Sequence, residues 1–179
     1  LRTVPEDAAT RAEATRRRLG VAPEAELVLA VGRQEPQKGL DVLLKAMPRV
    51  RSQIPGVRLL VAGREGRATP ALNRLVHDLG LAGAVTFLGM RDDVADLLGT
   101  ADVFAFPSLW EGAGGTLLEA MALECPIVST RLPTLLEMID DATAKLVTPR
   151  SSDDLARGLL DTLADRSTAH GRARAARAR

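Results

Sequence analysis

Short apolar runs that alternate with segments of helical period limit the folds open to this chain more than any other feature. Residues 27–31 contain no polar side chain and end at Gly32, which is typical of a strand buried on both faces. Apolar residues then recur at positions 40, 43, 44, 47 and 50, the spacing of an amphipathic helix. The same alternation predicts further strands at 57–62, 84–88, 102–106, 126–130 and 144–147.

Helices are predicted between these strands, and Gly20 and Gly80 mark the ends of two of them. Apolar strands joined by short connections require helices on both faces of a mainly parallel sheet. We therefore predict one α/β domain over residues 1–179, a doubly wound, Rossmann-like sheet of about six strands in the order 3-2-1-4-5-6. The helices are expected at 6–19, 40–50, 70–79, 92 or 93 to 98, 116–123, 135–139 and after a cap at Ser151 or Ser152.

Composition excludes several classes of protein. The 179 residues include one cysteine and two histidines, so neither a disulfide framework nor a Cys/His zinc site is expected. Aromatic residues make up 2% and tyrosine is absent, which disfavours nucleic-acid binding by base stacking. No apolar run approaches the ~20 residues of a membrane span. The chain starts at Leu1 with a charged stretch that is not a signal peptide, so we expect a piece of a longer, cytoplasmic protein.

The net charge of +1 conceals an uneven distribution. Residues 166–179 hold five arginines and no acidic residue, and without them 19 basic residues stand against 23 acidic ones, a net charge of −4. The basic end is either an arm for anionic lipid or nucleic acid, or the solvated end of a helix or a segment that docks on missing protein. We favour the second interpretation.

Two unusual loops follow the first and fourth predicted strands. In a sheet of this order, ligands bind between those two strands, beyond their carboxyl ends. The first loop, 32–39, begins at Gly32 and carries Arg33 and Lys38, whose cationic groups suit phosphate oxygens. The alternative interpretation is that Arg33 and Lys38 are ordinary surface cations that bind no ligand. The second loop, 107–119, should meet the first in one crevice.

Glycines and carboxylates make the second loop distinctive. Gly112, Gly114 and Gly115 precede a predicted helix, whose N-terminal N–H groups suit phosphate. Glu111 and Glu119 flank these glycines. Two carboxylates would repel a phosphate unless they contact another part of the ligand, such as sugar hydroxyls. The arrangement therefore points to a nucleotide sugar. Glu119 has a second interpretation, as the third helical residue of a capping box begun by Thr116.

Several motifs follow one another between about residue 27 and about residue 163. Together they resemble the C-terminal, donor-binding domain of a GT-B fold glycosyltransferase of the large retaining family 4, the glycosyl transferases group 1. The motifs are Gly32-Arg33-x4-Lys38-Gly39, Val61-Ala62-Gly63, Phe87-Leu88-Gly89, Ala101-Asp102-Val103, Phe106-Pro107-Ser108, Glu111-x7-Glu119 with Ala120-Met121-Ala122, and Pro126-Ile127-Val128.

The resemblance implies catalytic roles for three residues. Arg33 and Lys38 would bind the donor diphosphate and stabilise the leaving nucleotide, and Glu111 would face the donor sugar. No metal or other cofactor is implied, and the sequence contains no Asp-x-Asp triplet. The remaining donor-binding residues would be Gly32, the amides of Gly114, Gly115 and Thr116 for phosphate, Glu119 for ribose, and the backbone of Met90 and Arg91 for the base.

The chain departs from this family's pattern in two places. Ala113 and Gly115 stand where Phe and Leu are frequent, which would widen the sugar pocket. Arg131-Leu132-Pro133 stands where a Gly-Gly pair is frequent, so Arg131 would have to supply the contact from that loop.

The resemblance also implies partners. The N-terminal domain, absent from this chain, would supply most acceptor contacts, so we expect donor binding with little turnover. Membrane contact is expected only through the full-length protein, and nucleic acid is not expected. The alternative is a non-catalytic nucleotide-sugar-binding or regulatory module of GT-B fold. A GT-B epimerase is disfavoured by the Glu111–Glu119 spacing.

Overall fold

The predicted strands form one parallel six-stranded sheet in the order β3-β2-β1-β4-β5-β6, which confirms the expected topology. The computed structural model describes residues 8–112 and 114–179. The order of the sheet reverses between β1 and β4, so their carboxyl ends open on the crevice where ligands are expected. The strands are β1 (Leu27–Val31), β2 (Arg58–Ala62), β3 (Val85–Gly89), β4 (Val103–Phe106), β5 (Ile127–Thr130) and β6 (Lys145–Val147).

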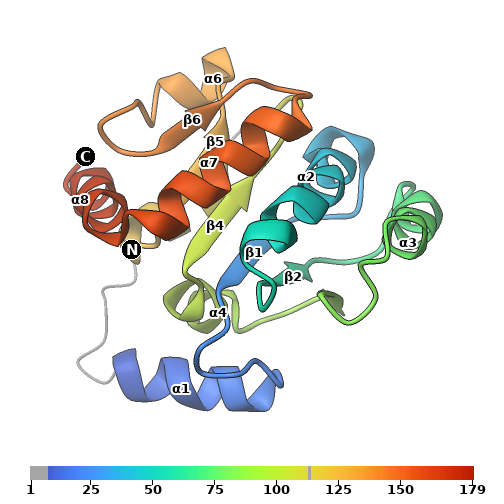
Figure 1. Ribbon diagram of the computed structural model, residues 1–179. Helices are drawn as coiled ribbons and strands as arrows, with labels where there is room; N and C mark the ends of the chain where they lie inside the picture. Colours follow the sequence, from blue (N-terminus) through green and yellow to red (C-terminus); the bar gives the residue numbers. More distant parts are fainter. Residues whose placement is uncertain (1–7, 113) are drawn as a thin grey trace.

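Helices cover both faces of the sheet (Figure 1). The sixth helix is a single turn and begins two residues before its predicted start. The first described helical residue is Ala8, so the predicted start at Glu6 lies outside the described residues. The helices are α1 (Ala8–Arg18), the 3₁₀ turn η1 (Pro36–Lys38), α2 (Leu40–Gln53), α3 (Thr69–Asp78), α4 (Val94–Thr100), α5 (Gly115–Ala122), α6 (Pro133–Leu136), α7 (Ser152–Ala164) and α8 (Arg166–Arg177).

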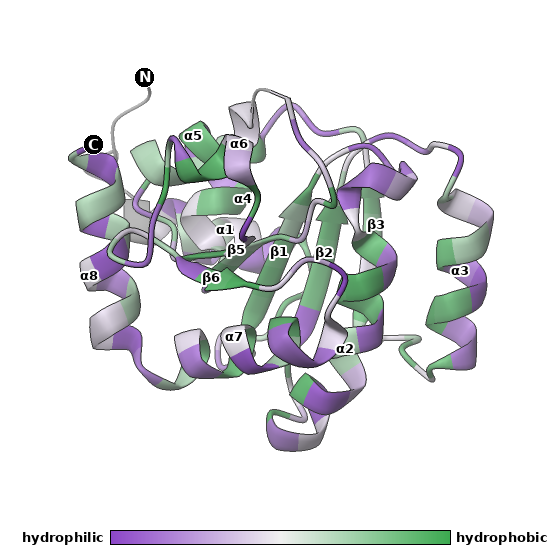
Figure 2. Cartoon of the chain, turned by 90° about the horizontal axis from the view of Figure 1, so that it is seen from above, coloured by the Kyte–Doolittle hydropathy of each residue, from purple (hydrophilic) through white to green (hydrophobic). Residues whose placement is uncertain are grey.

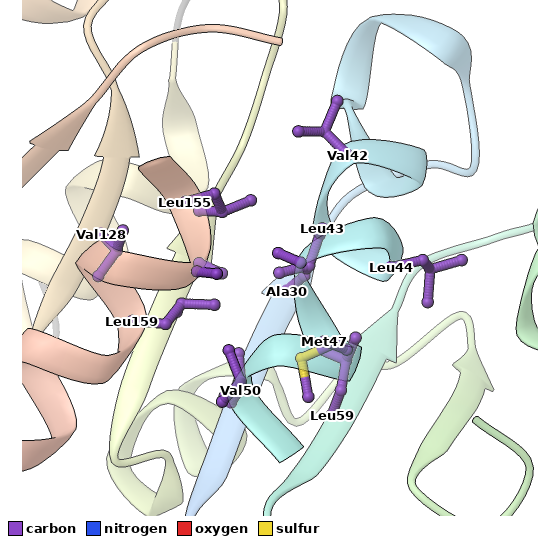
Figure 3. Close-up of a cluster of buried hydrophobic side chains, with 14 of the residues drawn as sticks. Ala30, Val42, Leu43, Leu44, Met47, Val50, Leu59, Val128, Leu155 and Leu159 are labelled. Atoms are coloured by element: carbon purple, nitrogen blue, oxygen red, sulfur yellow. The ribbon is translucent and has the colours of Figure 1, made fainter. Parts of the chain in front are cut away.

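Alternate strand residues pack into two hydrophobic layers. On one face, Val28 and Ala30 of β1 meet Leu43 and Met47 of α2, and α7 completes the layer (Figure 3). On the other face, the side chains between them in β1 pack with α4, α5 and the single turn α6. Figure 2 shows the apolar strands between these helical layers. The two-sided burial explains why the strands contain so few polar residues.

The β3 edge of the sheet is less covered than its centre. All five residues of β3 are half-buried, whereas β4 is buried throughout. The neighbouring helix α3 has one buried residue, Leu72, among those described.

The basic C-terminal segment is a packed helix, so the prediction of a solvated end was wrong. Ala169, Ala173 and Ala176 of α8 are buried, and Arg166 donates to a carboxylate oxygen of Asp102 at 2.7 Å. Arg166 also pairs with Glu26. The arginines therefore neutralise acidic residues of the same domain.

One helix cap was predicted correctly and another was not. The Ser151 hydroxyl accepts the amide N–H of Asp154 at 3.2 Å, which confirms Ser151 as the N-cap of α7. The N-cap of α5 is Gly114, so Thr116 lies in the first turn and the predicted capping box with Glu119 does not form.

Candidate functional site

The loops after β1 and β4 are joined through their backbones. The amide of Leu109 donates to the carbonyl oxygen of Gln37 at 2.7 Å. Gly39, which ends η1, has φ 62°, and a Cβ added there would lie 2.0 Å from the carbonyl oxygen of Pro107. Only glycine permits this approach with a left-handed backbone. The predicted convergence of the two loops is confirmed.

The end of β2 supports the beginning of the first loop. The amide of Gly32 donates to the carbonyl oxygen of Ala62 at 2.8 Å. Gly63 has φ 144°, and a Cβ added there would lie 1.9 Å from the carbonyl oxygen of Gly32. The side chain of Lys38 packs against Gly32, where an added Cβ would lie 3.4 Å from Lys38 Cδ. The beginning of the first loop is therefore in contact both with the end of β2 and with the lysine that follows it.

Lys38 and Glu111 form an ion pair between the two loops. Lys38 Nζ donates to Glu111 Oε2 at 2.6 Å, and the two side chains are 19% and 14% exposed. Lys38 Nζ also lies 5.8 Å from the centroid of the Phe106 ring, within the range of a cation–π interaction. Sequence reasoning assigned the two residues to different parts of a donor, and the structure places them in contact.

Three hydroxyl groups that sequence reasoning missed support Glu111. Ser108, which is buried, donates from Oγ to Glu111 Oε2 at 3.2 Å. Thr130 Oγ1, at the end of β5, donates to the carbonyl oxygen of Ser108 at 2.6 Å. Thr134 Oγ1 donates to the carbonyl oxygen of Glu111 at 3.1 Å. The Phe106-Pro107-Ser108 motif was the available signal for Ser108, whereas nothing local marked the two threonines.

Arg33 is exposed and makes no side-chain hydrogen bond or ion pair with the described residues. The other charged residues of loop 32–39 each pair with a residue outside it, since Lys38 contacts Glu111 and Arg67 Nε donates to Glu35 Oε2 at 3.0 Å. The hydrogen bond from Arg67 lowers the pKa of Glu35 below its ordinary value, and the charge of Arg33 acts in the same direction. Arg33 therefore presents a guanidinium without a partner among the described residues, on the same loop as Lys38.

The start of α5 is shaped by Gly114. Its φ of 55° turns the chain into the helix, and an added Cβ would lie 2.8 Å from Cε of Met138. Gly115 and Thr116 follow as the first helical residues, and their N–H groups have no backbone acceptor in the described part of the chain. Glu119, one turn further on, is exposed. This end of α5 can accept an anion.

The residues expected to meet a base lie after β3. Met90 is 83% exposed. The guanidinium of Arg91 donates to both carboxylate oxygens of Asp93, at 2.8 and 2.6 Å. This hydrogen bonding lowers the pKa of Asp93 and raises that of Arg91. With the Arg91 side chain engaged, the backbone of this turn and the exposed side chain of Met90 remain for a ligand.

One further expectation fails and another cannot be followed. The guanidinium of Arg131 pairs with the exposed carboxylate of Asp141 at 2.8 and 3.0 Å, so it is not free to contact a ligand from the loop after β5. That loop contributes Thr134 instead. Ala113 lies outside the described residues.

Neither a metal cluster nor a membrane-spanning helix is found in the described part of the chain. No three His, Cys, Asp or Glu side chains gather there as metal ligands. None of its helices has the length and apolar character needed to cross a bilayer. Cys125 is buried, and burial raises the pKa of its thiol to about 12. It therefore has the character of a core residue.

Comparison with proteins of known sequence shows which family the chain resembles. Residues 25–165 match the family described as "Glycosyl transferases group 1". The chain is 34% identical over 174 residues to the GDP-mannose-dependent alpha-(1-6)-phosphatidylinositol monomannoside mannosyltransferase of Mycobacterium tuberculosis. That match covers 91% of this chain and 44% of the relative. The chain thus spans less than half the length of the curated relatives it matches.

Solved structures show the same fold. HepE from Anabaena, crystallised with UDP and glucose, superposes with a TM-score of 0.88 at 27% identity, covering 94% of this chain and 46% of that one. The C-terminal domain of LpcC from Francisella tularensis, a glycosyl transferase group 1 family protein, superposes with a TM-score of 0.83 and covers 97% of this chain and 91% of that domain. At 21% identity, the second likeness is one of fold.

Proposed function

This chain belongs to the glycosyl transferases group 1 family, and we propose that it is the domain that binds the nucleotide-sugar donor. The observation that carries the proposal is the Lys38–Glu111 pair between the loops after β1 and β4, where the order of the sheet reverses. Arg33 lies on the same loop as Lys38, and α5 begins four residues after Glu111. A site with two cations, helix N–H groups and carboxylates matches a ligand that has both a diphosphate and sugar hydroxyls.

Each part of the donor has a candidate partner. Arg33, Lys38 and the α5 amides of Gly115 and Thr116 would hold the diphosphate. Glu111 would accept a hydroxyl of the transferred sugar. The remaining contacts would come from Gly32 and Gly114 in the two loops, from Glu119 to the ribose, and from the backbone of Met90 and Arg91 to the base.

In the proposed reaction, the bond between the anomeric carbon and the oxygen of the distal phosphate breaks. A bond forms from that carbon to an acceptor hydroxyl oxygen, on the same face of the sugar, and the hydroxyl proton is released to water. The departing nucleoside diphosphate gains negative charge, which Arg33, Lys38 and the α5 dipole would stabilise. We propose that these groups do so without a metal ion.

The greater length of the relatives supports the proposal that donor and acceptor are bound by different domains. Because the chain covers less than half of them, we propose that a second, N-terminal domain supplies the acceptor site and that this chain alone turns over little. A retaining, family 4 enzyme in the cytoplasm, without nucleic acid as a partner, remains our proposal. The names of similar proteins suggest a UDP- or GDP-linked sugar.

Thermal unfolding with added nucleotides tests this proposal. One of UDP, GDP or ADP should stabilise the chain by about 2.7 kcal/mol at a hundredfold excess over its dissociation constant, a rise in Tm of about 5–11 °C. Replacing both Arg33 and Lys38 by Ala should abolish the rise. Replacing Lys45 and Arg157, two exposed cations on other elements, removes the same charge and should leave the rise intact.

Two outcomes would contradict the proposal. One is the absence of any nucleotide-dependent rise in Tm. The other is an undiminished rise in the variant that lacks Arg33 and Lys38. Nucleotide binding without sugar transfer, when the chain is joined to its N-terminal domain, would favour the non-catalytic module instead.

A further inference from the structure

Glu111 neutralises one of the two cations available for a diphosphate. The Lys38 ammonium is 2.6 Å from Glu111 Oε2, and both side chains are mostly buried. An ion pair at this depth is screened less than one at the surface. Of the charges on loop 32–39, that of Arg33 alone has no ion-pair partner among the described residues, because Glu35 is bound by Arg67. The unliganded site therefore carries less positive charge than its sequence suggests.

The carboxylate is also held in place. Ser108 donates to the oxygen that receives Lys38, and Thr134 donates to the Glu111 carbonyl oxygen, so both ends of the residue are fixed. Thr130 in turn fixes the backbone of Ser108. A diphosphate that binds here must share Lys38 with the Glu111 carboxylate, which is held in place by Ser108. An ammonium has three N–H donors, so sharing is possible and the competition persists in the complex.

The competition has different consequences for the donor and the product. In a nucleotide sugar the distal phosphate carries one negative charge, and after transfer it carries an additional charge. Repulsion from a fixed carboxylate grows with that charge. We propose that Glu111, through its shared contact with Lys38, weakens retention of the nucleoside diphosphate and so promotes its release. This inference rests on the proposed function, since it presumes that the crevice binds a diphosphate.

Calorimetric titration of the whole chain with UDP and with GDP tests the inference without any sugar contact. For the nucleotide that wild type binds, Glu111→Gln should tighten binding about fivefold or more, because the hydrogen bond released to the phosphate is one made by a charged group. Glu35→Gln removes a carboxylate from the same loop that touches Arg67 and not Lys38. It should leave the affinity within about twofold, because its partner Arg67 is 82% exposed, is screened by solvent and is not among the proposed contacts of the diphosphate.

A double-mutant cycle isolates the pair. In a Lys38→Ala background, Glu111→Gln should tighten binding clearly less than in wild type, because the competition for Lys38 is gone and only the direct repulsion by the carboxylate remains. Melting curves establish that each variant is folded, and Glu111→Ala serves as the second variant if the Gln form is not. Unchanged or weaker nucleotide binding in the folded Glu111 variant would overturn the inference, as would equal tightening by Glu35→Gln. If wild type binds neither UDP nor GDP, ADP is titrated in the same way, and binding of none of the three would instead count against the proposed function.

Discussion

Gly39→Ala is the substitution that most directly tests how the two loops are joined. Gly39 and Gly80 share the same backbone conformation, with φ 62° at both positions. They differ in surroundings, because a Cβ at Gly39 would lie 2.0 Å from the carbonyl oxygen of Pro107, whereas a Cβ at Gly80 meets no atom within 4 Å. Gly80→Ala is therefore a control that carries the conformational cost without the clash.

The expected free energies separate the two variants. A left-handed backbone costs an L-residue about 1–2 kcal/mol, which applies to both alanines. Gly39→Ala adds the cost of forcing the loops apart, about 1–3 kcal/mol for an overpacked site. In a chain of this size each kcal/mol lowers Tm by about 2–4 °C. Gly39→Ala should therefore unfold several degrees below Gly80→Ala.

Thermal and urea unfolding of both variants measure this difference. Separating the loops also disturbs the hydrogen bond from Leu109 to Gln37 that helps to seat Lys38, so folded Gly39→Ala should lose its nucleotide response while Gly80→Ala keeps it. Equal loss of stability in the two variants would refute the claim that backbone contact between the loops sets the site's geometry.

Three further predictions concern parts of the chain outside the crevice. The buried thiol of Cys125, with its pKa raised to about 12, should react with a disulfide reagent far more slowly in the native protein than in urea; fast native labelling would contradict its burial. The hydrogen bond from the Thr148 amide is the main cause that lowers the pKa of Asp154 to about 2. The ionised Asp154 carboxylate therefore stabilises the folded state above about pH 4, and this contribution is lost as pH falls towards 2. Asp154→Asn should flatten this pH dependence in urea unfolding, and an unchanged profile would argue against it. Deleting residues 166–179 should lower Tm, whereas an unaffected Tm would restore the interpretation of that segment as a solvated arm.

Local patterns were sufficient to predict much of the fold. The apolar run before Gly32 and the helical spacing after it are properties of adjacent residues, and burial on both faces follows from them. The general rule for doubly wound sheets then predicted that the loops of Arg33 and Glu111 would meet. The structure confirms the strand order and this convergence.

Contacts between distant residues could not be predicted in the same way. Lys38 and Glu111 are 73 positions apart, and the sequence shows that each can bind a ligand but not that they bind each other. The acidic partners of α8, including Asp102 and Glu26, likewise lie far upstream, so an arginine-rich segment was interpreted as solvated. Thr116 failed as a cap because the αL conformation of Gly114 starts the helix earlier.

The unequal burial of the sheet has a consequence for motion. Strand β3 is half-buried along its length and α3 buries one of its described residues, so this edge has less apolar area to lose on opening than β4. Amide hydrogen exchange should therefore be faster in β3 than in β4 through local unfolding. In the proposed complex, the base would rest beside β3, which should open more readily, and the diphosphate beside β4, which should open less readily. We expect the first contact to adjust to different bases and the second to keep one arrangement for phosphate.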